Sequence, residues 1–234
     1  MKLVVANLKS SMLKTDLSDY LKGLKDLSYE NLILVPSDIF ISDFLKVSES
    51  VGVQNVSIYD KPNHTGSITA KQLESLGIRY CIVGHMEVRE NYHETNELIS
   101  DKVRILLNND INPILCIGEN LEQRDLNQTF KILANQIDVV FKENIDKRII
   151  IAYEPLWAIG SGLIPTINEI TVVINYIKDY IATNYGTEGI KVLYGGSVNS
   201  NNVNEIMSIY ECDGVLVGTS SFKINDLSAL INNL

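Results

Sequence analysis

Short apolar runs alternate along the chain with longer segments of helical periodicity. The runs are rich in β-branched side chains and fall at residues 3–6, 32–35, 53–58, 80–83, 111–116, 149–153, 191–194 and 215–217. Uninterrupted apolar runs of this length are typical of strands buried on both faces in a parallel sheet. The pattern therefore predicts a series of buried parallel strands.

Two of the intervening segments show a clear helical face. Behind Thr15, apolar side chains recur every three or four residues, at Leu17, Tyr20, Leu21, Leu24 and Leu27. Behind Thr166 they recur at Ile167, Ile170, Val173, Ile174, Ile177 and Ile181. Thr166 with Glu169 three residues later is the sequence pattern of a capping box, which predicts a helix start at this point.

Strands that alternate with helices imply right-handed βαβ units. Eight such units of roughly 29 residues fill a chain of 234 residues. This number favours a closed (β/α)8 barrel, a TIM barrel, as one domain over residues 1–234. An open doubly wound sheet stays as the alternative, and no Pro/Ser-rich stretch marks a linker.

Composition narrows the class of protein. The net charge of -9 argues against nucleic-acid binding, because that activity needs clustered Lys and Arg. The apolar start at residues 3–6 is too short for a signal peptide, and no run is long enough to span a bilayer. Three scattered cysteines in apolar runs suggest buried thiols in a reducing compartment. We therefore expect a cytoplasmic protein with neither membrane nor nucleic acid as a partner.

Polar side chains gather directly after the predicted strands. Asn7 and Lys9 follow the first strand, His85 the fourth, Glu119 the fifth and Glu154 the sixth. In a parallel barrel the carboxyl ends of all strands open onto one face. Each residue alone has an ordinary explanation, such as a solvated lysine or a carboxylate that caps a helix. Their common position predicts one site built from several loops.

Two glycine-bearing turns follow the last two strands, with the sequences YGGSV (194–198) and VGTSSF (217–222). Glycines let backbone N–H groups approach an anion closely, and a helix N-terminus adds partial positive charge. Each turn alone is also compatible with a simple tight turn. Together the two turns predict a phosphate site, which in (β/α)8 barrels usually lies after strands seven and eight.

The candidate residues suit one kind of chemistry. A carboxylate can remove a proton from carbon next to a carbonyl, while histidine, lysine and asparagine stabilise the charge that develops on oxygen. The sequence contains no cluster of metal ligands, no nucleophile beside a base and no dinucleotide-binding motif. The expected reaction is proton transfer on a small phosphate ester, without a metal and without a cofactor.

The sequence resembles the triosephosphate isomerase family over essentially its whole length. Family motifs occur in family order: Asn7-Leu8-Lys9, Thr65-Gly66, Gly84-His85-Met86-Glu87, CIGE (116–119), AYEPLWAIGSG (152–162), YGGSV (194–198) and DGVLVG (213–218). The resemblance implies interconversion of dihydroxyacetone phosphate and glyceraldehyde 3-phosphate through an enediolate, in glycolysis and gluconeogenesis. The family is a standard example of a glutamate base, a neutral histidine electrophile and a closing loop.

The resemblance also implies a role for each matching residue. Glu154 would move the proton, His85 would polarise the carbonyl, and Lys9 and Asn7 would stabilise negative charge. Glu87 would contact Lys9 and hold its ammonium. The amides that would bind the phosphate belong to Gly160, Ser197, Gly218 and Thr219.

A closing loop is expected to follow Glu154. Pro155 would stiffen the hinge, and Trp157 with its apolar neighbours would exclude water. Two departures from the family pattern bear on the site. Met86 replaces a serine that can hold the resting carboxylate, so we expect Glu154 to be less fixed before substrate binds. Thr219 replaces a common glycine but keeps its N–H, so we expect a modest effect.

The resemblance further implies a homodimer with twofold symmetry. The loop from Asp60 to Ser67 would cross to the partner, where Thr65 would support the partner's first strand end. Ser67 and Val88 stand where the family commonly has a glutamate and an arginine that pair near this interface. Both charges are lost together, so neither is left unpaired, and the altered contact is expected to weaken the dimer.

Two other functions remain open. Another phosphate-binding barrel isomerase or lyase would use the same two turns, although AYEPLWAIGSG (152–162) argues against it. A non-catalytic barrel that senses a sugar phosphate would not need Glu154, His85 and Lys9, all of which are present.

Overall fold

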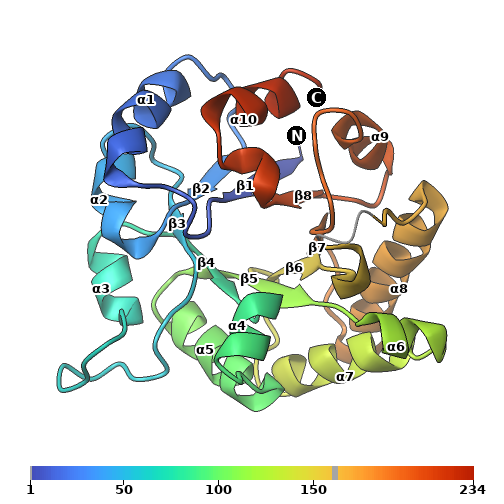
Figure 1. Ribbon diagram of the computed structural model, residues 1–234. Helices are drawn as coiled ribbons and strands as arrows, with labels where there is room; N and C mark the ends of the chain where they lie inside the picture. Colours follow the sequence, from blue (N-terminus) through green and yellow to red (C-terminus); the bar gives the residue numbers. More distant parts are fainter. Residues whose placement is uncertain (1, 160–162) are drawn as a thin grey trace.

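Eight parallel strands close into a barrel in the computed structural model, which describes residues 2–159 and 163–234 (Figure 1). The strands are β1 (Leu3–Asn7), β2 (Leu32–Val35), β3 (Gly52–Val53), β4 (Tyr80–Val83), β5 (Asn112–Ile117), β6 (Ile150–Tyr153), β7 (Lys191–Tyr194) and β8 (Gly214–Val217). Their order is β2-β1-β8-β7-β6-β5-β4-β3, and a parallel bridge between Leu34 and Val51 joins the two ends. The predicted (β/α)8 barrel is confirmed, and the open sheet is wrong.

The pleat of the strands divides the buried side chains into two sets. One set fills the barrel interior and includes Val5, Ile82 and Cys116. The alternate residues, such as Val4, Cys81 and Ile117, pack outward under the helices. Because side chains alternate along a strand, both faces of each strand are apolar, which explains the uninterrupted runs in the sequence.

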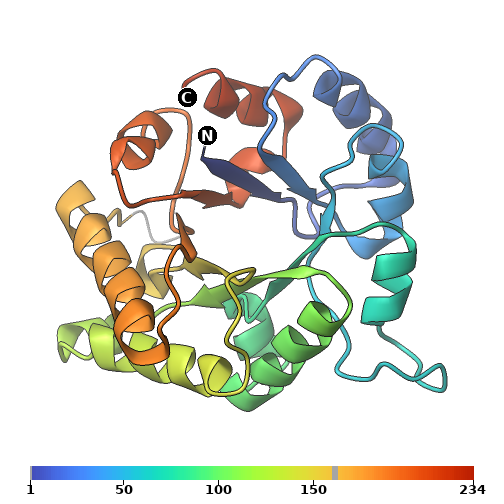
Figure 2. The same cartoon turned by 180° about the vertical axis from the view of Figure 1, so that it is seen from behind.

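Helices cover the outside of the barrel in chain order (Figures 1 and 2). They are α1 (Lys14–Leu24), α2 (Ile41–Phe44), α3 (Ala70–Ser75), α4 (Met86–Asn91), α5 (Asn96–Asn108), α6 (Leu121–Asp125), α7 (Thr129–Phe141), α8 (Ile167–Tyr185), α9 (Val203–Ser208) and α10 (Ile224–Ile231). Three short 3-10 helices lie in the connections: η1 (Asp38–Phe40), η2 (Leu156–Ala158) and η3 (Thr219–Ser221).

The start predicted for α8 agrees with the structure, whereas the bounds predicted for α1 do not. Helix α8 begins after Thr166, whose hydroxyl accepts from the Glu169 N–H while the Glu169 carboxylate accepts from the Thr166 N–H, so the capping box is confirmed. Helix α1 starts at Lys14, before Thr15, because the Asp16 carboxylate accepts the free N–H of Leu13. It ends at Leu24, so the predicted extension to Leu27 is wrong.

The third strand is much shorter than the sequence predicts. The run 53–58 was expected to be a strand, but β3 contains only Gly52 and Val53. Asn55 ends it, because its side-chain oxygen accepts the N–H of Val56 and its amide donates to the buried carboxylate of Glu94. Lys102 donates to both Asn55 and Glu94, so this turn is held by polar groups from α5 and the segment before it.

Candidate active site

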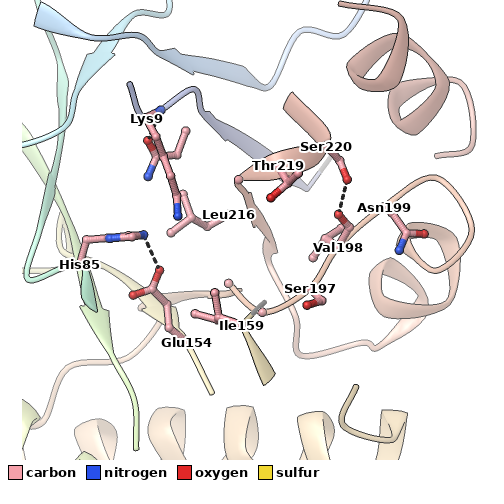
Figure 3. Close-up of a pocket in the computed structure, with 14 residues that line it drawn as sticks. Lys9, His85, Glu154, Ile159, Ser197, Val198, Asn199, Leu216, Thr219 and Ser220 are labelled. Carbon is pink, nitrogen blue, oxygen red and sulfur yellow. Dashed lines mark hydrogen bonds and ion pairs between the residues drawn. The ribbon is translucent and has the colours of Figure 1, made fainter. Parts of the chain in front are cut away.

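A cavity of about 230 Å³ lies where the strands end at the carboxyl side of the barrel (Figure 3). Its walls come from the carboxyl ends of β1 and β8 and from the segments that follow β1, β4, β6, β7 and β8. They include Asn7, Lys9, His85, Glu154, Ile159, Gly195, Gly196, Ser197, Val198, Asn199, Leu216, Gly218, Thr219 and Ser220. This volume is below the range usual for drug-sized ligands, so the cavity suits a small substrate.

Glu154 and His85 face each other on one side of this cavity (Figure 3). Glu154 directly follows β6, where its N–H donates to the carbonyl of Ile117 at 2.7 Å. Its carboxylate is buried, with the residue 2% exposed, and its Oε1 lies 3.2 Å from Nε2 of His85. A carboxylate in contact with an imidazole, at the edge of a small cavity, can act as a general base on a bound molecule.

The hydrogen bonds of His85 define which ring nitrogen carries a proton. His85 is the N-cap of α4, and its Nδ1 accepts the N–H of Glu87 at 3.3 Å. In a neutral imidazole one nitrogen accepts and the other donates, so Nε2 carries the proton and points toward Glu154. The ring is therefore arranged to donate a hydrogen bond to an oxygen in the cavity.

Burial raises the pKa of Glu154 above its ordinary value. The nearby His85 ring, the N–H of Met86, the charge of Lys9 and the thiol of Cys116 oppose this effect. Burial is the largest of these causes, so the carboxylate holds a proton more firmly than an exposed glutamate does. A raised pKa suits a group that must accept and return a proton near neutral pH.

The structure shows a backbone contact that bears on our expectation about Met86. We expect Glu154 to be less fixed before substrate binds, because Met86 has no hydroxyl to bind it. Glu154 Oε2 accepts the backbone N–H of Met86 at 3.4 Å, while Oε1 contacts His85. The backbone at the start of α4 thus offers a donor in place of the missing hydroxyl, and the looser hold on Glu154 stays a prediction.

Lys9 has an unusual backbone conformation for a residue with a side chain. Its φ is +47°, in the left-handed region that favours glycine. Asn7 accepts the Lys9 N–H, and Ser37 and Gln54 donate to the Lys9 carbonyl. These bonds hold the strained turn, and the Lys9 ammonium reaches the cavity and lies 2.7 Å from Oε1 of Glu87.

The turns after β7 and β8 form the other side of the cavity (Figure 3). Their residues, 194–199 and 217–221, carry no charged side chain. The hydroxyl of Ser220 donates to the carbonyl of Val198 at 2.8 Å and so joins the two turns. Within the described part of the chain, the N–H groups of Ser197 and Thr219 have no hydrogen-bond partner. Backbone donors are therefore available for an anion here.

The segment after Glu154 is anchored at its start. Pro155 leads into η2, and the N–H of Leu156 donates to the carbonyl of Glu119. The Glu119 carboxylate accepts from the indole of Trp157 at 2.9 Å, and Arg124 lies over the Trp157 ring at 3.7 Å. Glu119 therefore holds this segment, whereas the cap of α6 is Asn120.

Two of the predicted site residues, Gly160 and Thr65, are not among the described residues that line the cavity. Gly160 was expected to contribute an amide, but it lies outside the described residues. Thr65 is exposed in the loop between β3 and α3 and does not line the cavity of its own chain. That loop projects from the barrel in Figure 1.

Ser220 and Leu216 line the cavity although the sequence argument did not select them. Ser220 had a signal, since it belongs to the glycine-bearing turn after the last strand. Leu216 gave no signal, because an inward-facing leucine of a barrel strand looks the same whether it supports a cavity or a packed core.

Comparison with known proteins agrees with this geometry. The family model described as triosephosphate isomerase matches residues 2–234. The chain belongs to the triosephosphate isomerase family. Curated relatives carry the same name. The protein from Clostridium botulinum (strain Loch Maree / Type A3) is 34% identical, over 98% of this chain and 98% of its own. That from Francisella tularensis subsp. mediasiatica (strain FSC147) is 31% identical, over 99% and 96%.

A third triosephosphate isomerase, from Alkaliphilus oremlandii (strain OhILAs), is 39% identical over 78% of this chain and 76% of its own. The match to the triosephosphate isomerase family therefore covers all segments that form the cavity. No helix in residues 2–159 and 163–234 is long and apolar enough to cross a membrane.

Proposed function

We propose that this protein interconverts dihydroxyacetone phosphate and D-glyceraldehyde 3-phosphate by cofactor-free proton transfer. The observation that carries the proposal is the buried Glu154 carboxylate, 3.2 Å from the Nε2 of His85 and opposite two turns without charged side chains. The first arrangement suits proton abstraction next to a carbonyl, and the second suits a phosphate.

The proton transfer uses three groups. Glu154 removes the proton from one carbon of the substrate and returns it to the neighbouring carbon. His85 donates its Nε2–H to the carbonyl oxygen on which charge develops and takes a proton back from the neighbouring hydroxyl oxygen, so the carbonyl and hydroxyl exchange places, while the ammonium of Lys9 stabilises the enediolate. Asn7 supports Lys9, because its side-chain oxygen accepts the Lys9 N–H and so holds that turn.

The phosphate binds on the other side of the cavity. Support comes from the N–H groups of Ser197 and Thr219, next to Gly218, which have no hydrogen-bond partner among residues 2–159 and 163–234. Gly160 belongs to the same proposal as a further amide donor. Because the turns carry no lysine or arginine, recognition depends on backbone dipoles and on the Lys9 ammonium nearby.

Closure of the segment after Glu154 completes the site in this proposal. The Ser197 hydroxyl donates to the carbonyl of Ala158 at 2.8 Å, which links this segment to the phosphate turn. Pro155 limits motion beside the base, and Trp157 with Ile159 excludes water. Exclusion strengthens the charge interactions and opposes loss of phosphate from the enediolate.

Isomerisation by the purified protein tests the proposal directly. Formation of dihydroxyacetone phosphate from glyceraldehyde 3-phosphate is coupled to its reduction, and the wild type is compared with Glu154→Gln. We expect turnover that falls about 10³-fold in the variant while substrate binding persists. A folded wild type that binds triose phosphates without turnover would instead support a sensing barrel.

We also infer that two copies assemble through the loop from Asp60 to Ser67. Residues 61–67 are exposed, and the rings of Tyr59 and His64 stack at 4.0 Å to give the loop a firm base. In this assembly Thr65 reaches the partner's Lys9 turn. Sedimentation of the active protein is expected to give a dimer, and a fully active monomer at low concentration would contradict it.

The reaction places the protein in glycolysis and gluconeogenesis, and we propose that it acts in the cytoplasm as one domain. All three cysteines are unpaired and buried, which fits a reducing compartment. Fractionation of cells, followed by detection of the protein, tests this location.

A further inference from the structure

The relative position of Glu154 and His85 depends on the end of β5, which lies between them in the barrel. Strand β5 pairs with β4 up to Val83 and Leu115, and with β6 up to Ile117 and Tyr153. The β4–β5 pairs end there, whereas two backbone bonds continue the contact between β5 and β6: the Glu154 N–H donates to the Ile117 carbonyl at 2.7 Å and the Leu156 N–H to the Glu119 carbonyl at 3.0 Å. In the same register the next positions are Gly84 opposite Cys116, and Gly118 opposite Glu154.

Arg89 connects the first of these pairs by its side chain. Its Nε donates to the carbonyl of Gly84 at 2.6 Å, and its NH2 group donates to the carbonyl of Cys116 at 3.0 Å. The third guanidinium nitrogen donates to Asn96 at 2.7 Å, at the start of α5. A planar guanidinium offers several donors in a fixed geometry, so it sets the spacing of the groups it joins.

Gln136 holds one member of the second pair, Gly118. Its side-chain oxygen accepts the N–H of Gly118 at 2.9 Å, and its nitrogen donates to the Gly118 carbonyl at 3.0 Å. Both backbone groups of Gly118 are therefore held from α7. A Cβ atom on Gly118 would lie 1.7 Å from the carbonyl oxygen of Glu154, so the two backbones are in close contact.

Gly84 directly precedes His85, and Gly118 packs on the backbone of Glu154. We propose that Arg89 and Gln136 are positioning residues that together set the distance between His85 and Glu154: Arg89 joins β4 to β5 beyond the end of their ladder, and Gln136 fixes Gly118 where β5 meets the backbone of Glu154. Neither residue lines the cavity. The inference rests on the proposed isomerase activity, in which the substrate must fit between these two groups.

The consequence is that loss of either residue affects the chemical step and spares phosphate binding. A misplacement of about 1 Å between reacting groups can lower a rate about 10²-fold. The phosphate turns follow β7 and β8, and within residues 2–159 and 163–234 no hydrogen bond joins them to Arg89 or Gln136.

The test uses Arg89→Met, Arg89→Lys and Gln136→Glu. Lysine keeps the charge but lacks the planar guanidinium, whose separate nitrogens reach Gly84, Cys116 and Asn96, and glutamate keeps the acceptor for the Gly118 N–H but loses the donor. We expect kcat to fall about 10²-fold in Arg89→Met and about tenfold in the other two. KM and the inhibition constant of inorganic phosphate are expected to stay within about twofold.

Two substitutions elsewhere serve as matched controls. Arg148→Met removes an arginine that binds Asp146 and Asp110 at the opposite end of the barrel. Gln72→Glu keeps the acceptor for the Thr69 N–H at the start of α3, far from the cavity. Both controls are expected to keep wild-type kcat, and melting temperatures show that each variant is folded.

Three results would overturn the inference. One is wild-type kcat in folded Arg89→Lys and Gln136→Glu. The second is a parallel loss of kcat and phosphate affinity, which would indicate a generally loosened barrel. The third is an equal loss in the controls. An inactive wild-type protein would instead contradict the proposed function, so the two failures are distinguishable.

Discussion

The two sides of the cavity present different kinds of chemical groups. On one side, Glu154, His85 and Lys9 present ionisable side chains that are held by hydrogen bonds and ion pairs. On the other, the turns around Ser197 and Thr219 present backbone groups and small polar side chains. On the first side, one side-chain atom supplies each role, so function depends on the identity of the residue. On the second side, backbone N–H groups supply the donors, so function depends on the course of the backbone, and many side chains are compatible with it.

The largest effect that tests this contrast is expected from His85→Gln. Glutamine cannot both accept the Glu87 N–H and place a donor next to Glu154 as the rigid imidazole does. We expect kcat to fall about 10²-fold, with KM changed by less than about threefold. Steady-state kinetics check this split, and an equal change in KM would show that the histidine also determines phosphate binding.

A smaller effect is expected on the free energy of unfolding, through the buried carboxylate of Glu154. The pKa of Glu154 is raised by burial above its ordinary 4.5, so the protonated form is favoured in the folded protein. Its contribution to stability is therefore complete below pH 4.5 and is lost as pH rises through the folded pKa. Glu154→Gln is expected to raise the free energy of unfolding by about 1 kcal/mol at pH 8.

This gain corresponds to roughly 2–4 °C in melting temperature, and it should shrink toward pH 4.5. Melting curves at both pH values measure it. Glu30→Gln, at an exposed position, is the control and should change little at either pH. A variant that is less stable than the wild type at pH 8 would mean that Glu154 is held by more favourable interactions than its burial suggests.

The smallest effect is expected on the backbone side, from Thr219→Gly. Glycine keeps the N–H and removes only an exposed side chain, so KM should change by less than about twofold. Thr219→Pro sharpens the contrast, because proline fits the first position of η3 but lacks the N–H. One lost hydrogen bond to a charged group should raise KM about tenfold. Equal KM values in both variants would contradict binding by this amide.

Most of the barrel could be predicted because its strands are apolar on both faces. Such runs are unambiguous when they recur with helical segments between them, as β2, β4 and β7 show by matching their predicted bounds. The third strand failed because Asn55 turns the chain with partners from distant segments, Glu94 and Lys102. A local pattern contains no information about such partners.

The site shows the same limit. Glu154, His85 and Lys9 could be selected because they lie within two residues of a strand end and carry unusual side chains for such positions. Arg89 and Gln136 could not, since their partners are backbone groups of Gly84, Cys116 and Gly118, brought close only by the fold. The support of Glu154 by the Met86 N–H was hidden for the same reason.

Position 9 has two requirements that no single residue type meets fully: a left-handed backbone and a positively charged side chain. Glycine would adopt a φ of +47° without steric cost, and the turn around it would relax. Glycine has no ammonium, however, so the relaxed turn would leave the cavity without its positive charge. Selection for a more stable chain and selection for a faster one therefore favour different residues at position 9, and the lysine found there indicates which of the two has prevailed.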